Sequence, residues 1–295
     1  MVGRWLAARL AKTKQMNDGN VGELMEIYEK LDNLREQIRR LGSIVIAFSG
    51  GVDSTFLLRV ASDVLGDRVV AVTARSSTYP EREFREAEAF AKSLGAKHIV
   101  ITSEELEIDG FADNPVNRCY YCKNELFQKV KEIAKQHGIP HVADGSNLDD
   151  LGDYRPGLQA VEELAVISPL REAQMTKQDI RLLSKDMQLP TWNKQSFACL
   201  ASRVPYGHKI TRETLTMVDR AEQYLLDLGF RQVRVRHHEY MARIEVGADE
   251  RSRFFNEALM DQVSDELRQI GYRYVTLDMR GYRTGSMNEV LTPEE

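Results

Sequence analysis

The sequence lacks the features that define several large classes of protein. No apolar run approaches the roughly 20 residues that a membrane-spanning helix needs. There are three cysteines, and an odd number does not suit a disulfide framework. Basic residues are not in excess, because 40 Lys and Arg face 45 Asp and Glu for a net charge of −5, whereas a general nucleic-acid binder is usually basic. We therefore expect a cytoplasmic protein with no membrane and no nucleic-acid partner.

The composition is typical of one large or two medium globular domains. Of the 295 residues 42 % are hydrophobic, which is enough for a core and too many for a disordered chain. We divide the chain into an N-terminal extension at 1–20, an α/β domain with a leading helix at 21–195 and a smaller α/β domain at 196–295. Residues 1–17 are basic and lack both acids and serine, so we interpret them as a helical extension and not a transit peptide.

Hydrophobic periodicity predicts the order of the elements. Apolar residues at alternating three- and four-residue steps predict a long amphipathic helix from Leu24 to Leu41. Strands and helices then alternate, which predicts a doubly wound parallel sheet with helices on both faces. The strands are expected at 44–48, 69–72, 98–101 and 141–143, and the helices at 55–65, 81–94, 123–136 and from about 176 to before 190. Thr176 and Asp179 are a possible capping pair at the start of the last of these helices. The smaller domain should contain helices at 213–228 and 251–270 and strands at 232–237, 241–246 and 274–278.

The most informative stretch follows the first strand and opens a helix; it consists of Ser49, Gly50, Gly51, Val52, Asp53 and Ser54. It does not end in Gly-Lys-Ser/Thr, which excludes a Walker A loop. The glycines let the backbone approach a ligand, and the helix start offers unpaired N–H groups to phosphate oxygens. Asp53 can hold a magnesium ion. The stretch resembles the SGGxDS loop of the ATP pyrophosphatases, which cut ATP between the α and β phosphates. A turn that binds no ligand is the alternative.

Polar residues also follow two other strands of the predicted sheet. The carboxyl ends of parallel strands form the usual ligand edge. We therefore expect the ATP or AMP site to include Thr73, Ala74, Arg75, Gly145 and Asn147. For the turn that contains Gly145 and Asn147, an Asx-capped turn without a ligand is the alternative.

The three cysteines lie in two separate places. Cys119 and Cys122 form a CxxC pair just ahead of a predicted helix, whose start favours thiolates, and Cys199 lies far downstream. Three soft ligands are one short of a closed Cys₄ site, so they fit a [4Fe–4S] cluster with one open iron. A redox or persulfide pair, a zinc site completed by His or Asp, and three unconnected thiols are the alternatives.

Several segments together resemble the LarE family of sulfur transferases, which mature a nickel-pincer cofactor. They are the loop at 49–54 and the segments at 144–147, 153–157, 198–207 and 280–285. The first loop is shared by a whole superfamily, whereas the Asp-Tyr-Arg-Pro-Gly run at 153–157 and the segment around Cys199 are more specific. The resemblance covers the chain from about Leu31 to Leu291.

This resemblance implies the reaction and its cofactors. ATP and Mg²⁺ would adenylate a carboxylate of pyridinium-3,5-biscarboxylic acid mononucleotide, and a sulfur nucleophile would displace AMP to leave a thiocarboxylate. Family members with a single cysteine give up its sulfur, whereas members with three are held to bind a [4Fe–4S] cluster. With Cys119, Cys122 and Cys199 this chain is similar to the second type. A sulfide or other sulfur donor and a homo-oligomer, a trimer or a hexamer, are also implied.

A second anion site is expected for the phosphate of the mononucleotide. Arg234 and Arg236 alternate with valines on a predicted strand, so both guanidinium groups share one face. A solvated basic face is the alternative. Ser202 and Arg203 are expected to line the substrate pocket beside Cys199, and Glu222 matches an acidic residue that the family uses near the substrate.

Three rival functions use parts of the same pattern. An amidating enzyme similar to NAD or GMP synthetase would use ammonia and need no cysteines. A tRNA thiolase would share the loop and the three cysteines but needs a broad basic surface. A regulatory protein that senses adenine nucleotides without chemistry would not need three cysteines near one another.

Overall fold

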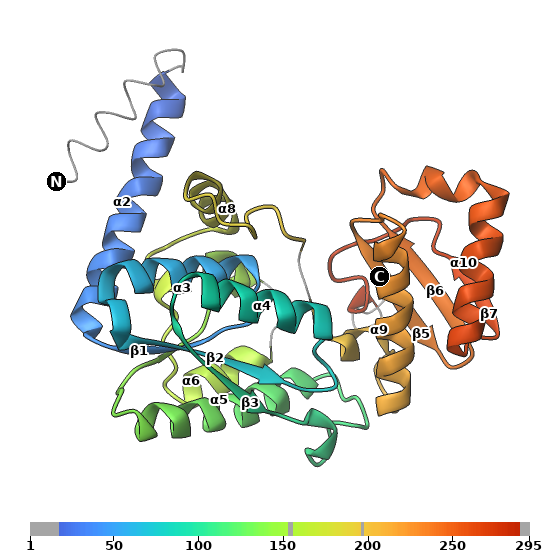
Figure 1. Ribbon diagram of the computed structural model, residues 1–295, viewed down its shortest axis with the longest axis horizontal. Coiled ribbons are helices and arrows are strands. Elements are labelled where there is room, and N and C mark those ends of the chain that lie inside the picture. Colours follow the sequence, from blue (N-terminus) through green and yellow to red (C-terminus); the bar gives the residue numbers. More distant parts are fainter. Residues whose placement is uncertain (1–17, 153–155, 196–197, 290–295) are drawn as a thin grey trace.

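A parallel four-stranded sheet forms the centre of the first half of the chain (Figure 1). The computed structural model describes residues 18–152, 156–195 and 198–289. The strands, in the spatial order β3-β2-β1-β4, are β1 (Ile44–Ala47), β2 (Val69–Arg75), β3 (Lys97–Thr102) and β4 (Val142–Ala143). Every pairing between them is parallel. A single parallel bridge from Ala143 to Ile167 continues the pattern beyond β4.

Helices cover both faces of this sheet, which confirms the predicted doubly wound α/β fold. They are α2 (Asp18–Leu41), α3 (Val52–Leu65), α4 (Glu81–Ser93), α5 (Arg118–Gln136), α6 (Gly157–Glu163), α7 (Pro169–Glu172) and α8 (Lys177–Asp186). Alternate residues of β1 serve two different cores: Ile44 and Ile46 pack with α2, α3 and α4, whereas Val45 packs with α5. Successive side chains of a strand point to opposite faces of the sheet. A sheet that is buried on both faces therefore needs strands that are apolar on both sides.

The strand order places a switch point beside β1. The chain moves outward from β1 to β2 and β3, then returns through α5 to β4 on the other side of β1. The loops after β1 and β4 therefore meet at this switch point, at the carboxyl ends of the strands, where ligands of such sheets bind. The loops at 48–51 and 144–147 are the two that flank it.

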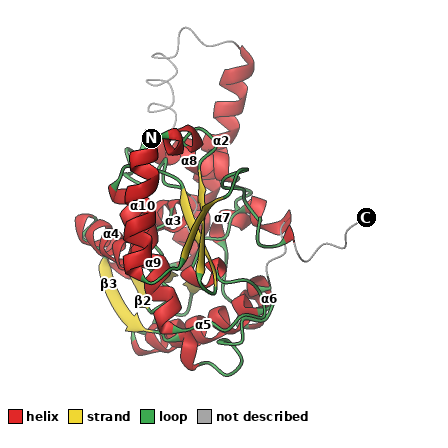
Figure 2. Ribbon diagram, turned by 90° about the vertical axis from the view of Figure 1, so that its right-hand side faces the viewer, coloured by secondary structure: helices red, strands yellow, loops and turns green. Residues whose placement is uncertain are grey.

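A second, three-stranded sheet lies in the C-terminal part of the described chain. Strands β5 (Val233–His238) and β6 (Met241–Val246) pair antiparallel, and β7 (Tyr274–Leu277) pairs parallel with β6. Helices α9 (Arg212–Asp227) and α10 (Glu257–Ile270) lie side by side against this sheet (Figure 2). They share a separate core with it, centred on Val235, Ile244 and Leu267. The exact boundary at residue 196 between the two units stays a prediction.

Local structure differs from the expectation in the helices predicted at 251–270 and from residue 123. The helix expected at 251–270 is divided, because Asn256 caps α10 by accepting from the Leu259 N–H at 3.2 Å. The segment before it forms only a short 3₁₀ turn. The helix expected from residue 123 begins at Arg118, so Cys119 and Cys122 lie within its first turns. Short 3₁₀ turns occur at η1 (Gly66–Arg68), η2 (Glu105–Glu107), η3 (Leu148–Gly152), η4 (Leu200–Arg203) and η5 (Arg251–Phe255).

Two further findings concern the start of α8 and the hydropathy of the helices. The capping pair predicted at Thr176 and Asp179 forms a reciprocal capping box at the start of α8. In the described part of the chain no helix is long and apolar enough to span a bilayer.

Candidate functional site

The loop between β1 and α3 is held in a conformation that only glycine tolerates at one position. Gly50 has a φ of +62°, and a Cβ built on it would lie 2.8 Å from Cβ of Ala87 in α4. Both the backbone angle and the contact exclude a larger residue. The hydroxyl of Tyr79 donates to the Ser49 carbonyl at 2.7 Å and fixes the other side of the turn. The loop is therefore preorganised by its neighbours.

The start of α3 offers backbone N–H groups to an anion. Gly51 is the N-cap in an extended conformation, and no side chain accepts from the first N–H groups of the helix. Gly145 packs directly against this start, because a Cβ there would lie 3.0 Å from the Ser54 nitrogen. The hydroxyls of Ser49 and Ser54 lie 3.2 Å apart at the same point. This arrangement suits phosphate oxygens.

Opposing effects act on the pKa of the Asp53 carboxyl. Burial raises the pKa of its carboxyl, an ion pair with Lys177 of α8 opposes that rise, and the nearby Asp150 adds to it. The second oxygen, Oδ1, is buried and receives no hydrogen bond from the described residues. A carboxylate oxygen without a donor is the type of ligand that Mg²⁺ prefers. Asp53 is therefore the residue of this loop that fits a magnesium ion.

The second loop, at 144–147, is braced from within. Asp144 accepts from the Ser146 N–H at 3.1 Å and from the Ser168 hydroxyl at 2.8 Å. Asn147 accepts from the Asp149 N–H at 2.9 Å, which is the Asx-type turn named as the alternative. The loop therefore has an internal structural role, and the contribution of Gly145 and Asn147 to a nucleotide site stays a prediction.

The last three residues of β2 offer fewer unengaged polar side chains than the sequence indicates. The Thr73 hydroxyl is buried and donates to the Phe48 carbonyl at 2.7 Å, so its side chain is already engaged. Arg75 is exposed, pairs with Glu81 at 2.9 Å and lies over the ring of Phe84. Ala74 has no polar side chain. Their contact with a nucleotide stays a prediction, and for Thr73 it is limited to the backbone.

The three cysteines gather in one region although Cys199 is far from the other two in sequence. Cys122 and Cys199 both pack against the buried cluster that includes Phe111 and Leu200. Cys119 is exposed at the same end of α5, and its charge acts on both other thiols. The Cys122 thiol lies 3.7 Å from Oε1 of Glu105. The donor set is therefore three thiols from two segments.

The environment of these thiols does not favour thiolates in the absence of a cation. Burial raises the pKa of Cys122 first, and the negative charges of Glu105 and the other two cysteines raise it further. Burial likewise raises the pKa of Cys199, together with Cys119. The expectation that the helix start favours a thiolate is wrong for Cys122, because burial and like charge outweigh the helix dipole there. Within the described residues, no set of three or more His, Cys, Asp or Glu side chains is arranged to hold a metal ion.

A buried ion pair contacts the backbone at Cys199. Arg203 is fully buried and donates from Nε and Nη2 to the two carboxylate oxygens of Glu222, at 2.8 and 2.9 Å. It also donates from Nη1 to the Cys199 carbonyl at 3.0 Å and to the Ser202 hydroxyl at 2.9 Å. Burial opposes ionisation of Glu222, but Arg203 outweighs it and holds the pKa of Glu222 below its ordinary value. Arg82 also contacts Glu222, so these groups form a scaffold for the Cys199 segment.

The two arginines of β5 lie on one face as predicted, but they are buried. Arg236 is bound on both sides of its guanidinium, to the carboxylate of Glu245 at 2.8 and 3.0 Å and to the Ser202 carbonyl at 3.0 Å. Arg234 lies over the ring of Tyr282. Burial and then the charge of Arg203 lower the pKa of Arg234 to about 10. The solvated basic face named as the alternative is wrong.

One short segment connects the nucleotide loop with the cysteine segment. Tyr79 binds the Ser49 carbonyl through its hydroxyl, and one residue earlier the Thr78 carbonyl accepts from the Leu200 N–H at 2.9 Å. Leu200 directly follows Cys199. The loop of the first sheet and the segment that carries the third cysteine are therefore held near each other by residues 78 and 79.

Three residues at the site escaped the sequence reasoning. Lys177 pairs with Asp53, Lys194 donates to the Gly50 carbonyl at 3.3 Å and pairs with Glu83, and Arg118 is buried beside the cysteines. Lys177 and Lys194 reach the site from segments remote in sequence, whereas Arg118 directly precedes Cys119. No local pattern marks them, except that Lys177 follows the predicted capping residue of α8.

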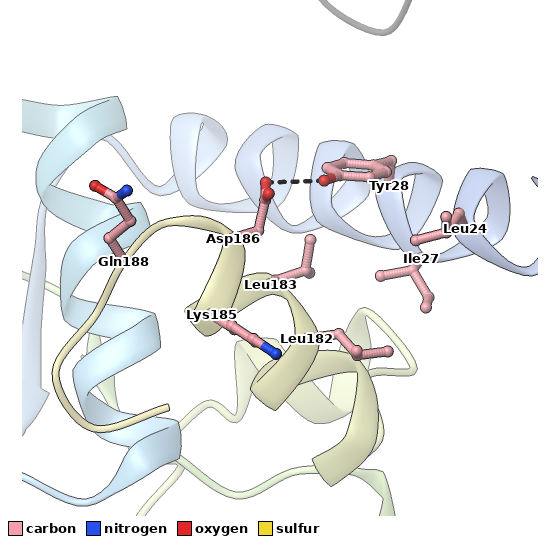
Figure 3. Close-up of a pocket in the computed structure, with 8 residues that line it drawn as sticks. All are labelled: Leu24, Ile27, Tyr28, Leu182, Leu183, Lys185, Asp186 and Gln188. Atoms are coloured by element: carbon pink, nitrogen blue, oxygen red, sulfur yellow. Dashed lines mark hydrogen bonds between the residues drawn. The ribbon is translucent and has the colours of Figure 1, made fainter. Parts of the chain in front are cut away.

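Some predicted residues fall elsewhere. Asp153, Tyr154 and Arg155 of the family-like run, and Phe197, lie outside the described residues. A surface hollow of about 380 Å³ lies between α2 and α8 (Figure 3), and none of its lining residues is a predicted site residue. There the Tyr28 hydroxyl bonds to Asp186 at 2.9 Å, and Leu24 and Ile27 face Leu183.

Comparison with known proteins agrees with this geometry. Residues 43–190 match the family described as the arginosuccinate synthase N-terminal HUP domain. An uncharacterised protein of Synechocystis sp. is 43 % identical over 89 % of this chain and 98 % of its own length. The pyridinium-3,5-bisthiocarboxylic acid mononucleotide synthase of Lactiplantibacillus plantarum is 40 % identical over 86 % of this chain and 92 % of its own length. An uncharacterised protein of Methanocaldococcus jannaschii is 27 % identical over 88 % of this chain and 98 % of its own length.

The fold, the loop at Ser49–Ser54 and the matched domain define an ATP-dependent enzyme of the PP-loop ATP pyrophosphatase superfamily. Identity and coverage go further than the superfamily. The chain belongs to the LarE family, the family of the mononucleotide synthase of L. plantarum.

Proposed function

We propose that this protein is an ATP-dependent sulfur transferase that converts the carboxylates of pyridinium-3,5-biscarboxylic acid mononucleotide to thiocarboxylates, for synthesis of a nickel-pincer cofactor. The observation that carries the proposal is the connection through Thr78 and Tyr79, which joins the nucleotide loop to the Cys199 segment. An enzyme that activates a carboxylate and then delivers sulfur to it needs both sites side by side. The family of the chain supports the same substrate.

The first step is activation of the carboxylate. A substrate carboxylate oxygen attacks the α phosphorus of ATP, the bond from that phosphorus to the bridging oxygen breaks, and pyrophosphate leaves with the electron pair. The N–H groups at the start of α3 face the departing phosphates and stabilise the charge that builds on them. Asp53 would hold Mg²⁺ through its free oxygen. A carboxylate needs this step because oxide is a poor leaving group.

The second step is sulfur transfer. An anionic sulfur of the hydrosulfide type attacks the acyl carbon, a C–S bond forms, and the bond from that carbon to the adenylate oxygen breaks. AMP leaves with the electron pair, and the sulfur proton is released to solvent. No general base is required, because the nucleophile is already an anion. Ser202 and Arg203 hold the backbone around Cys199 where this step would take place.

The cysteine site fits an iron–sulfur cluster in its donor chemistry. Cys119, Cys122 and Cys199 are three thiols whose negative charges would repel one another on ionisation, and a cationic group among them would relieve that repulsion. When bound, a [4Fe–4S] cluster held by three cysteines supplies an open iron position for an external sulfur ligand. A sulfide or other sulfur donor is then required as a partner.

The substrate phosphate is assigned to the arginines of β5. Arg236 is bound bidentately by Glu245, and Arg234 lies over the ring of Tyr282 and donates to the Val233 carbonyl at 2.7 Å. The low pKa of Arg234, about 10, reflects burial next to Arg203, and a phosphate would relieve that repulsion. Glu222 acts through Arg203 in this scheme. A cytoplasmic location and assembly as a trimer or hexamer complete the proposal, and light scattering on the purified protein tests the assembly.

Anoxic purification and a paired assay test the function. The parent protein should carry iron and sulfide, release pyrophosphate when given ATP and the bis-carboxylate mononucleotide, and form product in which oxygen is replaced by sulfur. Cys199→Ala should keep pyrophosphate release and lose the sulfur-containing product. Asp53→Asn should lose both, whereas Asp63→Asn, on the same helix but paired with Arg59 at the surface, should lose neither.

Each rival function predicts a different result in the same assay. Pyrophosphate release that requires tRNA and not the mononucleotide would identify a tRNA thiolase. Product formed with ammonia in place of sulfide would identify an amidating enzyme. ATP binding without any pyrophosphate release in the presence of all of these substrates would identify a nucleotide sensor.

A further inference from the structure

Arg118 is a buried cation for which the described chain provides no anion. It is the first residue of α5 and its side chain is 4 % exposed. Its Nε and Nη1 atoms are buried and have no hydrogen-bond acceptor in the described part of the chain. A buried guanidinium without an acceptor is costly, because it loses its hydration and gains no compensating bond.

Two other buried arginines of this region are each paired with a carboxylate. Arg203 has the carboxylate of Glu222, and Arg236 has the carboxylate of Glu245. Both are bound bidentately, which is the geometry that suits a buried guanidinium. Arg118 departs from this pattern at the same site, so its lack of a partner is a specific feature that calls for a ligand.

The position of Arg118 is fixed in advance. Its guanidinium carbon lies 4.6 Å from the centre of the Tyr206 ring, and the Tyr206 hydroxyl bonds to Asn288 at 3.0 Å. Asn114 anchors the preceding turn by donating to the Val204 and Pro205 carbonyls at 3.1 and 2.7 Å. The stacking contact covers one face of the guanidinium and leaves its N–H edges available. The group is therefore held in place while its donors stay unused.

Arg118 lies close enough to the thiols for its charge to act on Cys199. Arg118 directly precedes Cys119 in the chain. Burial raises the pKa of Cys199, and the positive charge of Arg118 is one of the two charges that oppose this rise. The other is Arg203, which is already bound to Glu222. Arg118 is thus a positive charge next to the cysteines that has capacity for a further anion.

We infer that Arg118 is the anion-binding residue of the cysteine site and receives the hydrosulfide-type anion before its transfer, an inference that rests on the proposed function. A small monovalent anion fits a single guanidinium edge, and a charge-assisted hydrogen bond would hold it. In the transfer step this anion forms the C–S bond, the C–O bond to AMP breaks, and the sulfur proton passes to solvent. Arg118 keeps its own proton throughout.

Kinetics of two substitutions test this role. In Arg118→Met the KM for sulfide should rise about 10- to 100-fold, the factor expected for loss of one charge-assisted hydrogen bond. The yield of thiocarboxylate per pyrophosphate released should fall, because the adenylate then hydrolyses. Arg118→Lys keeps the charge and should restore part of the affinity for sulfide. An unchanged KM for sulfide in Arg118→Met would overturn the inference, and a rise in the KM for the mononucleotide in its place would assign Arg118 to the substrate carboxylate.

Stability of the metal-free protein provides a second readout that does not depend on activity. Because Arg118 has no acceptor, Arg118→Met should leave the Tm equal to or above that of the parent. Arg203→Met is the matched control on the same cluster and should lower the Tm, because it leaves Glu222 buried without its partner. A fall in Tm for Arg118→Met as large as for Arg203→Met would show a structural role and overturn the inference.

Bromide serves as a heavy surrogate for the anion. Crystals of the metal-free protein soaked in sodium bromide should show an anomalous peak within hydrogen-bond distance of the Arg118 guanidinium, and crystals of Arg118→Met should not. A peak that persists in Arg118→Met would overturn the assignment. Parent protein that releases no pyrophosphate with the mononucleotide would refute the proposed function, whereas parent that transfers sulfur while Arg118→Met keeps the parental KM for sulfide would refute this inference alone.

Discussion

The nucleotide loop and the cysteine region are built in opposite ways. The loop is one continuous stretch, Ser49–Ser54, whose donors are backbone groups at the start of α3. The cysteine region joins the 3₁₀ turn after Cys199, helix α9 and strand β5 through buried charges such as Arg203 and Glu222. The groups that suit a phosphate thus lie in six adjacent residues, whereas the cysteine region depends on charges brought together from distant segments.

The largest effect is expected where the cysteine region depends on one buried carboxylate. Glu222→Ala leaves Arg203 buried without its partner and removes an acceptor for the Val235 N–H. Breaking such a pair costs about 3–5 kcal/mol, so the free energy of unfolding measured in urea should fall by that amount. Glu213→Gln, on the exposed face of the same helix, is the control and should change little. A loss below about 1 kcal/mol for Glu222→Ala, the range of a surface pair, would show that the two regions do not differ in this respect.

The nucleotide loop should be most sensitive at Gly50. Gly50→Ala combines a positive φ with a contact of 2.8 Å to Ala87, so pyrophosphate release should fall at least tenfold, roughly the rate equivalent of 1.4 kcal/mol. Gly95→Ala is the control for backbone strain alone, because its φ is +64° and nothing lies within 4 Å. Adding Ala87→Gly should recover part of the lost activity. If both glycine variants lose activity equally, close approach to α4 is not what shapes the loop.

The pH dependence of the loop follows from the raised pKa of Asp53. Burial raises this pKa above that of the unfolded chain, so ionisation of Asp53 weakens the fold, and its contribution to stability is lost as the pH rises through the interval between the two values. Activity has the opposite slope, because only the ionised carboxylate can hold Mg²⁺. Pyrophosphate release at low magnesium should therefore decline as the pH falls, at a higher pH than for an ordinary aspartate.

Lys177 allows a direct test of that limb. Lys177→Met removes the charge that opposes the rise in the pKa of Asp53, so the acidic limb should move to higher pH by about one unit or more. Arg59→Met, which removes an exposed pair elsewhere on α3, should leave the limb in place. A limb that stays fixed in Lys177→Met would mean that another group titrates.

The smallest effect is expected at the edge of the nucleotide site. Arg75 and Glu81 form an exposed pair, so Arg75→Ala should change the free energy of unfolding by about 0.5 kcal/mol or less. The predicted nucleotide contact adds a separate expectation, a rise in the KM for ATP. Unchanged KM together with unchanged stability would remove Arg75 from the site.

Sequence reasoning recovered the elements with strong local signals. The alternation of apolar strands with helices gave the doubly wound sheet, and Thr176 with Asp179 marked the start of α8. It extended a helix through Asn256 because the periodicity of η5 and α10 is continuous and the cap was overlooked. It placed Cys119 and Cys122 ahead of α5, whereas they lie within this helix. It could not predict the raised pKa of Cys122, because burial next to Glu105 is a tertiary property.

By itself the sequence determined which chemistry is available: a loop whose backbone groups suit a phosphate, a carboxylate suited to magnesium, and three thiols. These depend on residue type and on neighbours a few positions away, which set local backbone geometry. Only the tertiary structure decided which buried charges have a partner among the described residues and which do not. Arg203 and Arg118 are both buried arginines beside cysteines, yet one is bound to Glu222 and the other has no acceptor in the described chain. The cost of burying a charge depends on what the fold places against it, and that is not contained in any local stretch.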